Sequence, residues 1–248
     1  MQTMTQRIVL EITGADRVSF LQGLVTNDVD RPTGSIVYSA LLTPQGKYLA
    51  DFFVIVEAER LLLDVAESRA ASLLQRLNMY RLRADVQIME TDIPVARGTG
   101  SMPNGALNDP RHDALGWRSY IEGAVSDETD YHALRVVHMI PETGIELTPE
   151  TYILEAGFEA LNGVDFKKGC FVGQEIVSRM KHKTTLKKGL ARVAIDGAAA
   201  PGDPITADNK PVGTLHTVAG NQGLAYLRFD RAVSVMQAGD ATLTRIDN

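Results

Sequence analysis

The first ninety residues alternate between short runs with the hydrophobic pattern of strands and two segments with helical spacing. Strands are predicted at residues 6–13, 35–43, 47–58, 60–65 and 84–90. A helix is predicted after Asp16, which is placed to cap it, because Val18, Leu21 and Val25 recur at helical intervals. A second helix is predicted at residues 67–80, with hydrophobic residues along one face. This order predicts an α+β sheet with helices on one face.

The rest of the chain changes character twice. Residues 97–119 are rich in Gly, Pro, Asn and Asp, a composition that predicts a long loop. Helical spacing returns at residues 130–139 and 173–183. After about Lys183 only short strand-like segments remain, separated by turn residues, at 189–197, 203–220, 223–230 and 241–246. This pattern is typical of a small β-barrel or sandwich, so we expect a β-rich C-terminal domain.

The composition is that of an ordinary globular protein: of 248 residues, 44% are hydrophobic and 23% are charged. A net charge of -6 argues against non-specific coating of nucleic acid. No apolar run approaches the roughly 18 residues of a membrane helix, and the N-terminus lacks the pattern of a secretory signal. A single cysteine excludes an internal disulfide and fits a reducing compartment. We therefore predict a cytoplasmic protein.

That cysteine, Cys170, lies in the stretch VDFKKGCFVGQE, with Lys167 and Lys168 before it and Gly169 and Gly173 on either side. The helix predicted from residue 173 places the thiol just before a helix N-terminus. Positive potential from the lysines and the helix favours the nucleophilic thiolate. The glycines permit a tight turn or the close approach of a ligand. The alternative is a small buried hydrophobic residue.

A basic run, SRMKHKTTLKKGLAR, follows this stretch at residues 178–192. It fits either a solvated helix end with a linker or a site for an anion such as a carboxylate or phosphate. The sequence lacks the residues that other chemistries need. An iron-sulfur cluster needs about four thiolate-type ligands, so a chain with one cysteine could only share a cluster with a partner protein. The histidines lack metal-site spacing, and no P-loop, G-x-S-x-G or G-x-G-x-x-G pattern occurs. A pair of Cys170 and His182 stays open, because sequence gives no geometry.

The motif KKGCFVGQE resembles the signature of the YgfZ family, K-G-C-[FY]-x-G-Q-E. Four further blocks resemble the family in the expected order: ITGADRVSFLQGLVTNDV, LLTPQGKYLADFFV, DPRHDALGWR and PVGTLHTVAGNQGLAYLR. The similarity therefore covers nearly the whole chain. The family consists of folate-binding proteins tied to iron-sulfur cluster assembly or repair and to tRNA modification. It shares a superfamily with the glycine-cleavage T-protein, a tetrahydrofolate-dependent aminomethyltransferase.

The resemblance implies an α+β cloverleaf. Two α+β units, of ferredoxin-like or mixed-sheet type, and a C-terminal β-barrel would surround a central folate channel. The two intertwined units would occupy residues 1–182, the second of them at roughly 45–115, and the barrel would occupy residues 183–248.

The resemblance also implies site residues. Cys170 is the expected functional thiol, with Lys168 and Asp51 as further catalytic candidates. The residues that match the motif directly are Lys168, Gly169, Cys170, Gly173, Gln174 and Glu175. The residues expected to contact folate are Asn27, Asp28, Tyr131 and Arg179. Tetrahydrofolate or a derivative is the expected cofactor.

Three positions depart from the family pattern. Ala50 stands where the aminomethyltransferases carry one carboxylate of an acidic pair, and alanine cannot shuttle a proton, so glycine-cleavage activity is not expected. Val137 stands where a glutamate would bind the pterin ring, and an unpaired buried pterin donor would cost about 1–3 kcal/mol. Some YgfZ proteins have tryptophans near the positions of Arg7 and Tyr131; Tyr131 could still stack on a pterin.

Two functions follow as expectations. The first is a tetrahydrofolate-binding accessory protein that supports assembly or repair of iron-sulfur clusters in client enzymes, including tRNA-modifying ones, through Cys170. The second is a folate-dependent one-carbon transferase, in which the part of the basic run from Lys181 to Lys188 binds the folate glutamate tail. The expected partners are folate and iron-sulfur client or assembly proteins, and no membrane. Binding of tRNA is a weaker candidate because the chain is acidic.

Overall fold

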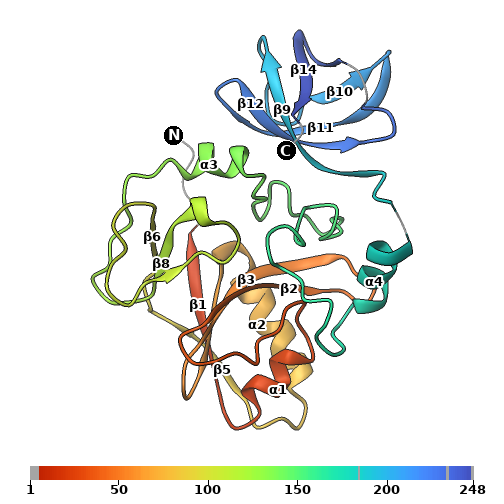
Figure 1. Cartoon of the computed structure of the whole chain (residues 1–248). Coiled ribbons are helices and arrows are strands. Elements are labelled where there is room, and N and C mark those ends of the chain that lie inside the picture. The colour runs from red at the N-terminus through yellow and green to blue at the C-terminus, as the bar shows by residue number, and fades with distance from the viewer. Residues whose placement is uncertain (1–5, 184, 233–234, 247–248) are drawn as a thin grey trace. The chain divides into compact units, whose positions relative to one another are not determined.

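The computed structural model describes residues 6–183, 185–232 and 235–246 (Figure 1). The chain forms two compact units. The first contains residues 1–129 and 159–176, and the second contains residues 130–158 and 177–248. Each unit is thus built from two separate segments, and the chain leaves the first unit, enters the second, and returns before completing both.

A five-stranded antiparallel sheet is the main layer of the first unit, in the order β2-β3-β4-β1-β5. Its strands are β1 (Arg7–Thr13), β2 (Ile36–Leu42), β3 (Tyr48–Val56), β4 (Leu61–Ala66) and β5 (Gln87–Thr91). All five were predicted from the hydrophobic pattern, and β2 and β3 pair as an antiparallel hairpin. Short connections place β2, β3 and β4 side by side.

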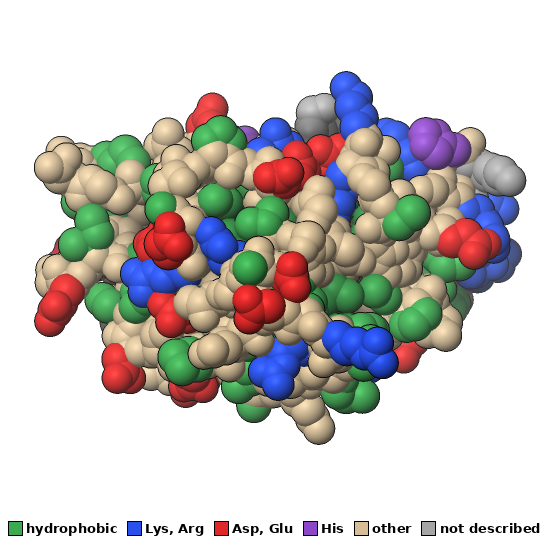
Figure 2. All heavy atoms as spheres, turned by 90° about the horizontal axis from the view of Figure 1, so that it is seen from below, with side chains coloured by type: hydrophobic (Ala, Val, Ile, Leu, Met, Phe, Trp, Pro, Cys, Tyr) green, Lys and Arg blue, Asp and Glu red, His purple; other side chains and the backbone are tan. Residues whose placement is uncertain are grey.

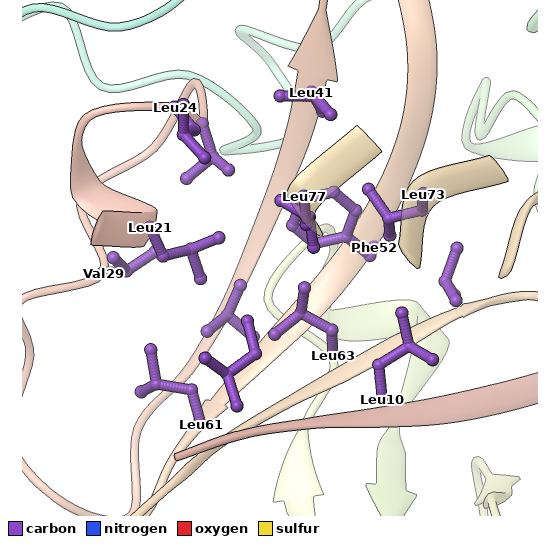
Figure 3. Close-up of a cluster of buried hydrophobic side chains, with 14 of the residues drawn as sticks. Leu10, Leu21, Leu24, Val29, Leu41, Phe52, Leu61, Leu63, Leu73 and Leu77 are labelled. Carbon is purple, nitrogen blue, oxygen red and sulfur yellow. The ribbon is translucent and has the colours of Figure 1, made fainter. Parts of the chain in front are cut away.

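The hydrophobic core of this unit lies between the sheet and its helices, α1 (Arg17–Gln22) and α2 (Glu67–Arg81). Alternate side chains of each strand turn to the helices. Figure 3 shows members of the resulting cluster: Leu10, Phe52 and Leu63 from the strands and Leu21, Leu73 and Leu77 from the helices. Burial of each such side chain stabilises the folded unit by about 1.5–3 kcal/mol.

The opposite face of the same sheet carries polar side chains. The register pairs Tyr38 with Phe53 and Phe53 with Asp64, so these three side chains point to the same side. Tyr38 and Asp64 are fully buried. Since buried polar groups need hydrogen-bond partners, this face has to be covered by residues that supply them.

A small three-stranded sheet, in the order β6-β8-β7, lies within the segment that was predicted to be a loop. It comprises β6 (Ala96–Gly98), β7 (Leu107–Asn108) and β8 (Trp117–Ser119), with the 3-10 helix η1 (Asp113–Leu115) before β8. The loop prediction is corrected here. Strands of two or three residues are too short for alternation to reveal them.

Two further helices occur where they were predicted. Helix α3 (Tyr131–Val137) lies in the second unit, and the side chain of Asp130 caps it by accepting a hydrogen bond from the Ala133 N–H. Helix α4 (Gln174–Lys183) begins in the first unit and ends in the second.

The predicted cap of α1 is wrong. Asp16 occupies the N-cap position, but its side chain makes no hydrogen bond to the helix. Instead its carboxylate accepts the N–H of Asp85 at 2.8 Å. The side chain therefore ties the start of α1 to the segment before β5.

The second unit contains a closed barrel in the order β10-β11-β12-β9-β14-β13. Its strands are β9 (Lys188–Asp196), β10 (Pro204–Ala207), β11 (Lys210–Ala219), β12 (Gln222–Arg228), β13 (Met236–Ala238) and β14 (Ala241–Ile246). The four strand-like segments predicted from the sequence cover five of these strands, because residues 203–220 form both β10 and β11, and the three-residue β13 was missed. Fully buried Val193, Leu215, Leu227 and Leu243 fill the barrel.

The predicted fold class is confirmed: several sheets with helices are followed by a closed C-terminal β-barrel. The domain limits expected from the resemblance stay a prediction. Within the residues described, no helix has both the length and the apolar character needed to cross a membrane.

Candidate functional site

The motif loop, residues 163–173, is tied to the segment that follows α1. The backbone N–H of Asp165 donates to the carbonyl oxygen of Thr26 at 3.1 Å, and the Thr26 hydroxyl donates to the carbonyl oxygen of Gly163 at 2.7 Å. The Asp165 carboxylate also accepts the backbone N–H groups two and three residues further on, at 2.7 and 3.2 Å. This local pattern is an Asx turn, so the loop is fixed before the chain reaches the cysteine.

Lys168 turns its side chain towards the end of α1. Its Nζ donates to the carbonyl oxygens of Gln22 and Val25 at 2.6 and 2.5 Å. Carbonyl groups at the C-terminal end of a helix carry partial negative charge and favour a cation. Burial lowers the pKa of Lys168 to about 8, although nearby carboxylates oppose this. The predicted catalytic role of Lys168 stays a prediction, and its observed contacts are with backbone carbonyls.

Cys170 is exposed, which excludes the alternative of a small buried residue. It precedes Gln174, the first residue of α4, by one turn of chain. Exposure makes the thiol accessible to a reactive group or a metal carried by another molecule. Lys167, its other basic neighbour in sequence, is exposed as well.

Gly173 ends the motif loop against the turn of the β2–β3 hairpin. Its φ is 84°, and a Cβ added there would lie 2.7 Å from the carbonyl oxygen of Thr43. Gly46, in that hairpin turn, has a φ of 74°, and its added Cβ would lie 2.8 Å from Cβ of Ile176. Both positions require glycine on two grounds, backbone conformation and space. A Cβ on Gly169, in contrast, would meet no heavy atom within 4 Å.

The last two motif residues begin α4. The backbone N–H of Gln174 donates to the carbonyl oxygen of Phe171 at 3.2 Å. Glu175 is exposed in the first turn of the helix, where the macrodipole favours a negative charge. Their observed positions account for the start of the helix, and their roles in function stay predictions.

Asn27 and Asp28 make contacts within the first unit. The Asn27 amide donates to the carbonyl oxygens of Tyr38 at 2.8 Å and Asn162 at 2.6 Å. Asp28 accepts a hydrogen bond from the Gln22 side chain at 2.9 Å. Both amide hydrogens of Asn27 are therefore used to join β2 to the segment before the motif loop. The predicted folate contact of these two residues stays a prediction.

Asp51 lies buried on β3 between two tyrosines. One carboxylate oxygen accepts the Tyr48 hydroxyl at 2.7 Å and the other accepts the Tyr38 hydroxyl at 3.0 Å. Burial raises the pKa of Tyr38, and the negative charge of Asp51 raises it further, so the phenol stays protonated and donates. The predicted catalytic role of Asp51 stays a prediction, and its observed partners are the two tyrosines.

Asp64 on β4 is a fully buried carboxylate that is not among the residues predicted from the sequence. It accepts Arg7 Nε at 2.6 Å, Arg118 Nη2 at 2.5 Å and the Tyr120 hydroxyl at 2.9 Å. Burial acts to raise the pKa of Asp64, but Arg118 and Arg7 outweigh it and hold the pKa well below its usual range. The available signal was a lone charge in LLLDVA, because a charge inside an apolar strand needs a partner.

Arginines cover the polar face of the sheet around Phe53. The guanidinium carbons of Arg7, Arg111 and Arg118 lie 5.6, 4.8 and 3.9 Å from the centre of the Phe53 ring. Asp109 holds Arg111 through Nε at 3.0 Å and Nη2 at 2.8 Å. Cations over an aromatic face and bidentate carboxylate pairs both favour this arrangement. The DPRHDALGWR block therefore supplies the buried counter-ions of the sheet.

The other residues predicted to contact folate, Tyr131 and Arg179, lie in the second unit. Tyr131 is buried in the first turn of α3, and Arg179 is exposed on α4. Val137, which replaces the expected pterin-binding glutamate, is 41% exposed at the end of α3. Its carbonyl oxygen accepts Arg192 Nη1 at 2.8 Å.

The second unit has a buried ion pair of its own, which was also not predicted. Glu146 accepts Arg135 Nη1 at 2.9 Å and the hydroxyl of Thr217. Arg135 Nη2 donates to the same Thr217 hydroxyl oxygen. Since Arg135 is on α3 and Thr217 is on β11, this group of three side chains fixes the helix to the barrel.

The described part of the chain groups neither metal ligands nor all the residues predicted for a pterin site. Among the residues that the structure describes, no three or more His, Cys, Asp or Glu side chains are grouped so as to hold a metal ion. The residues predicted for folate fit a pterin only in part. Asn27 has both amide hydrogens engaged, Val137 has no side-chain acceptor, and Tyr131 offers a largely buried ring.

Two protein-family domains match this chain, one in its N-terminal part and one in its C-terminal part. Residues 2–97 match the GCVT N-terminal domain, and residues 187–247 match the C-terminal beta-barrel domain of CAF17. The second match coincides with the closed barrel. The resemblance inferred from the sequence is thus confirmed at the level of these two domains, and the narrower assignment to YgfZ stays a prediction.

Curated relatives extend the similarity through the middle of the chain. The human mitochondrial iron-sulfur cluster assembly factor IBA57 is 28% identical, over 89% of this chain and 75% of its own length. The mouse protein of the same name is 27% identical, over 90% and 76%. The IBA57 homolog of Neurospora crassa is 28% identical over 75% of this chain, which spans about half, 51%, of that relative. The predicted cytoplasmic location is contradicted, because these relatives are named as mitochondrial proteins.

A solved structure agrees with the fold. The glycine cleavage system aminomethyltransferase T from Bartonella henselae superposes with a TM-score of 0.78, over 98% of this chain and 83% of its own. The two sequences are 12% identical. The likeness shows an aminomethyltransferase-like fold and carries no statement about activity.

Proposed function

We propose that this protein supports the assembly of iron-sulfur clusters in client proteins, with Cys170 as its functional thiol. One observation carries the proposal. The only cysteine is exposed on a loop fixed at both ends, within a chain similar over 89% of its length to a human iron-sulfur cluster assembly factor. A thiol of this kind is presented to other molecules rather than used for packing.

The proposed chemistry is ligation of cluster iron as cargo. The Cys170 thiol releases its proton to solvent, and the thiolate sulfur donates an electron pair to one iron, displacing a labile ligand. No electron is transferred in this step. Because a cluster needs about four thiolate-type ligands, the client or an assembly partner supplies the others, and the bond to Cys170 breaks when the client completes its own set.

The decisive experiment is complementation of a strain that lacks this gene. Cys170→Ala and Cys170→Ser are expected to leave iron-sulfur enzyme activities at the level of the deletion. Ser101→Ala, at another exposed position, is expected to restore them fully. Immunoblots establish equal amounts of protein. Full restoration by Cys170→Ala excludes the thiol from the function.

Clients that modify tRNA are part of this proposal. In the deletion strain, thiolated nucleosides in total tRNA are expected to fall together with other iron-sulfur activities. Mass spectrometry of digested tRNA measures them. Normal thiolation alongside reduced activity of other iron-sulfur enzymes would remove tRNA-modifying enzymes from the client set.

Binding of tetrahydrofolate, or a derivative of it, belongs to the proposal as a separate element. The match of residues 2–97 to the GCVT N-terminal domain and the buried Asp51 between two tyrosines support it. Calorimetric titration under reducing, oxygen-free conditions tests it, with Tyr131→Ala and Cys170→Ala as variants. Saturable binding weakened by Tyr131→Ala is expected. Absence of binding to the wild-type protein would leave the thiol function without folate.

A one-carbon transferase is the second candidate function. Asp51 is retained within the region that matches the GCVT domain, and it is buried and hydrogen-bonded. Ala50, however, cannot hold or deliver a proton. An assay of tetrahydrofolate-dependent transfer with candidate donors is expected to show no turnover above a boiled control. Turnover abolished by Asp51→Asn would establish this function instead.

A further inference from the structure

We propose that Lys168 and Gly46 are positioning residues that hold the motif loop on either side of Cys170, so that the thiol is exposed but fixed in place. This inference rests on the proposed function of the thiol. It assigns to Lys168 a mechanical task, in place of the expected catalytic one. It also brings in Gly46, which lies outside the motif and had no expected role.

The first fixed point is the Lys168 side chain. Its Nζ lies 2.6 and 2.5 Å from the carbonyl oxygens of Gln22 and Val25, at the end of α1. It also lies 5.3 Å from the centre of the Phe171 ring. Hydrogen bonds from a charged donor are stronger than those between neutral groups. The ammonium group thus joins the residue after Cys170 to the helix that precedes β2.

The second fixed point is the contact between two glycines. Gly173 and Gly46 both have positive φ, and the Cα of Gly46 would lie 3.1 Å from a Cβ added to Gly173. The backbone of the motif loop therefore lies directly on the hairpin turn, with no room for a side chain between them. Ile176, in the first turn of α4, closes the contact from the other side.

The two contacts bracket the cysteine. Lys168 lies two residues before Cys170 and Gly173 lies three residues after it. A thiol that ligates iron held by another protein gains affinity when its position is set in advance, because less conformational entropy is lost on binding. Exposure gives access to the partner, and the two contacts reduce the entropy cost.

A catalytic role and a positioning role of Lys168 predict different measurements. If its charge activates the thiol, then removing the charge must shift the reactivity of Cys170 with pH. If it fixes the loop, removing it must loosen the loop, and an uncharged change at Gly46 must have the same effect. Cys170 is the only cysteine, so any thiol label reports this position alone.

The test compares Lys168→Met, Lys168→Arg and Gly46→Ala in the full chain. Hydrogen exchange of residues 163–173, whose amides at Asp165 and Lys168 are hydrogen-bonded, is expected to accelerate about tenfold in Lys168→Met and in Gly46→Ala. Lys168→Arg is expected to recover part of the protection. The pH midpoint of Cys170 alkylation by iodoacetamide is expected to stay unchanged in all three.

Two matched controls accompany these variants. Lys167→Met removes a neighbouring exposed charge without touching the contacts. Gly34→Ala imposes alanine at a φ of 89° where an added Cβ meets nothing within 4 Å, so it reproduces backbone strain without a clash. Both are expected to leave exchange of the motif loop as in the wild type. Circular dichroism separates local loosening from failure to fold, and Lys168→Met carries the test if Gly46→Ala does not fold.

Exchange within twofold of wild type in Lys168→Met, together with a shifted alkylation midpoint, would overturn the proposal. Faster exchange only in Lys168→Met and not in folded Gly46→Ala would overturn the role of Gly46. These readouts do not depend on cluster assembly. Failure of the complementation experiment with Cys170→Ala therefore counts against the proposed function, and failure of the exchange experiment counts against the positioning residues.

Discussion

Asp64 shows how one buried charge determines the side chains around it. Donor groups of three residues, Arg7 of β1, Arg118 of β8 and Tyr120, converge on its two oxygens. The cost of burying a carboxylate is offset only while these partners are present. The sheet face and the segment that covers it are therefore energetically coupled through this residue.

Asp64→Asn is expected to destabilise the protein by about 3 kcal/mol, because it leaves Arg7 and Arg118 without their shared counter-charge. Denaturant unfolding monitored by Trp117 fluorescence at pH 7 measures this. The stabilising charge of Asp64 is present above the usual carboxyl pKa and is lost as pH falls towards the lowered folded value. The difference in the free energy of unfolding between Asp64→Asn and the wild type should therefore shrink below about pH 4.

Asp230→Asn is the control, since Asp230 and its partner Arg228 are both half-exposed at 3.5 Å. It is expected to leave the free energy of unfolding close to that of the wild type, because solvent screens an exposed pair. Equal effects of the two substitutions would contradict the importance assigned to Asp64.

Lys168 gives a prediction at alkaline pH. Burial lowers the pKa of Lys168 in the folded protein to about 8, from the usual 10.5 of a lysine, so the unfolded chain binds more protons between these values and the free energy of unfolding rises with pH there. The unfolding free energy of wild type minus that of Lys168→Met should therefore increase from pH 8 to about pH 10. Solvent screens part of the effect, because the side chain is only half-buried.

Urea titrations at three pH values measure this difference. Lys167→Met, at the exposed neighbouring position, should show a flat difference over the same range. A difference that falls as pH rises would mean that the two carbonyl contacts hold Lys168 in its charged form more strongly than burial opposes it.

At the scale of elements, α3 and the barrel depend on one another. Arg135 of α3, Glu146 and Thr217 of β11 share hydrogen bonds within the second unit. Because a helix of seven residues is marginal alone, α3 relies on this contact and on its Asp130 cap.

Glu146→Gln is expected to destabilise the second unit by about 3 kcal/mol, since it leaves buried Arg135 without its main counter-charge. Hydrogen exchange should accelerate in α3 and β11 and remain unchanged in β1–β4. Glu150→Gln, an exposed glutamate in the same segment, is the control. Uniform acceleration over both units would show that the effect is not local.

The length of an element decides whether the sequence alone can predict it. Strands of six or more residues with one buried face were found from alternation, as in β1, β9 and β14. Elements of two or three residues, such as β7 and β13, were missed because they contain less than one period of the pattern. Asp16 does occupy the predicted N-cap position, but its side chain does not bind the helix. It accepts the N–H of Asp85 instead, and a partner so far along the chain cannot be predicted from the local pattern.

In the candidate site, too, local patterns were found and contacts between distant segments were missed. The motif around Cys170 was found because its residues are contiguous in sequence. Asp64, Arg118 and Glu146 were missed because their partners come from distant segments, and a single sequence does not reveal which distant segments meet. Gly46 was missed because the space around it is filled by Ile176, which belongs to a segment far along the chain.

For the whole molecule, the acidic net charge limits binding to nucleic acid. Lys and Arg side chains lie among Asp and Glu side chains over much of the face shown in Figure 2. Any shift of tRNA by this protein at 50 mM salt is expected to disappear by about 200 mM, as for non-specific contacts to phosphates. Electrophoretic mobility measures this. A complex that survives 200 mM salt would indicate a specific tRNA site.

The order of the segments has a consequence for synthesis on the ribosome. The first unit is completed by residues 159–176, which follow a segment of the second unit. At translation rates of roughly 5–20 residues per second, this return segment emerges about 2–10 s after residue 129. A nascent chain can bury the sheet and its two helices during that interval. The thiol of Cys170 is then delivered to a hairpin and a helix end that have already formed.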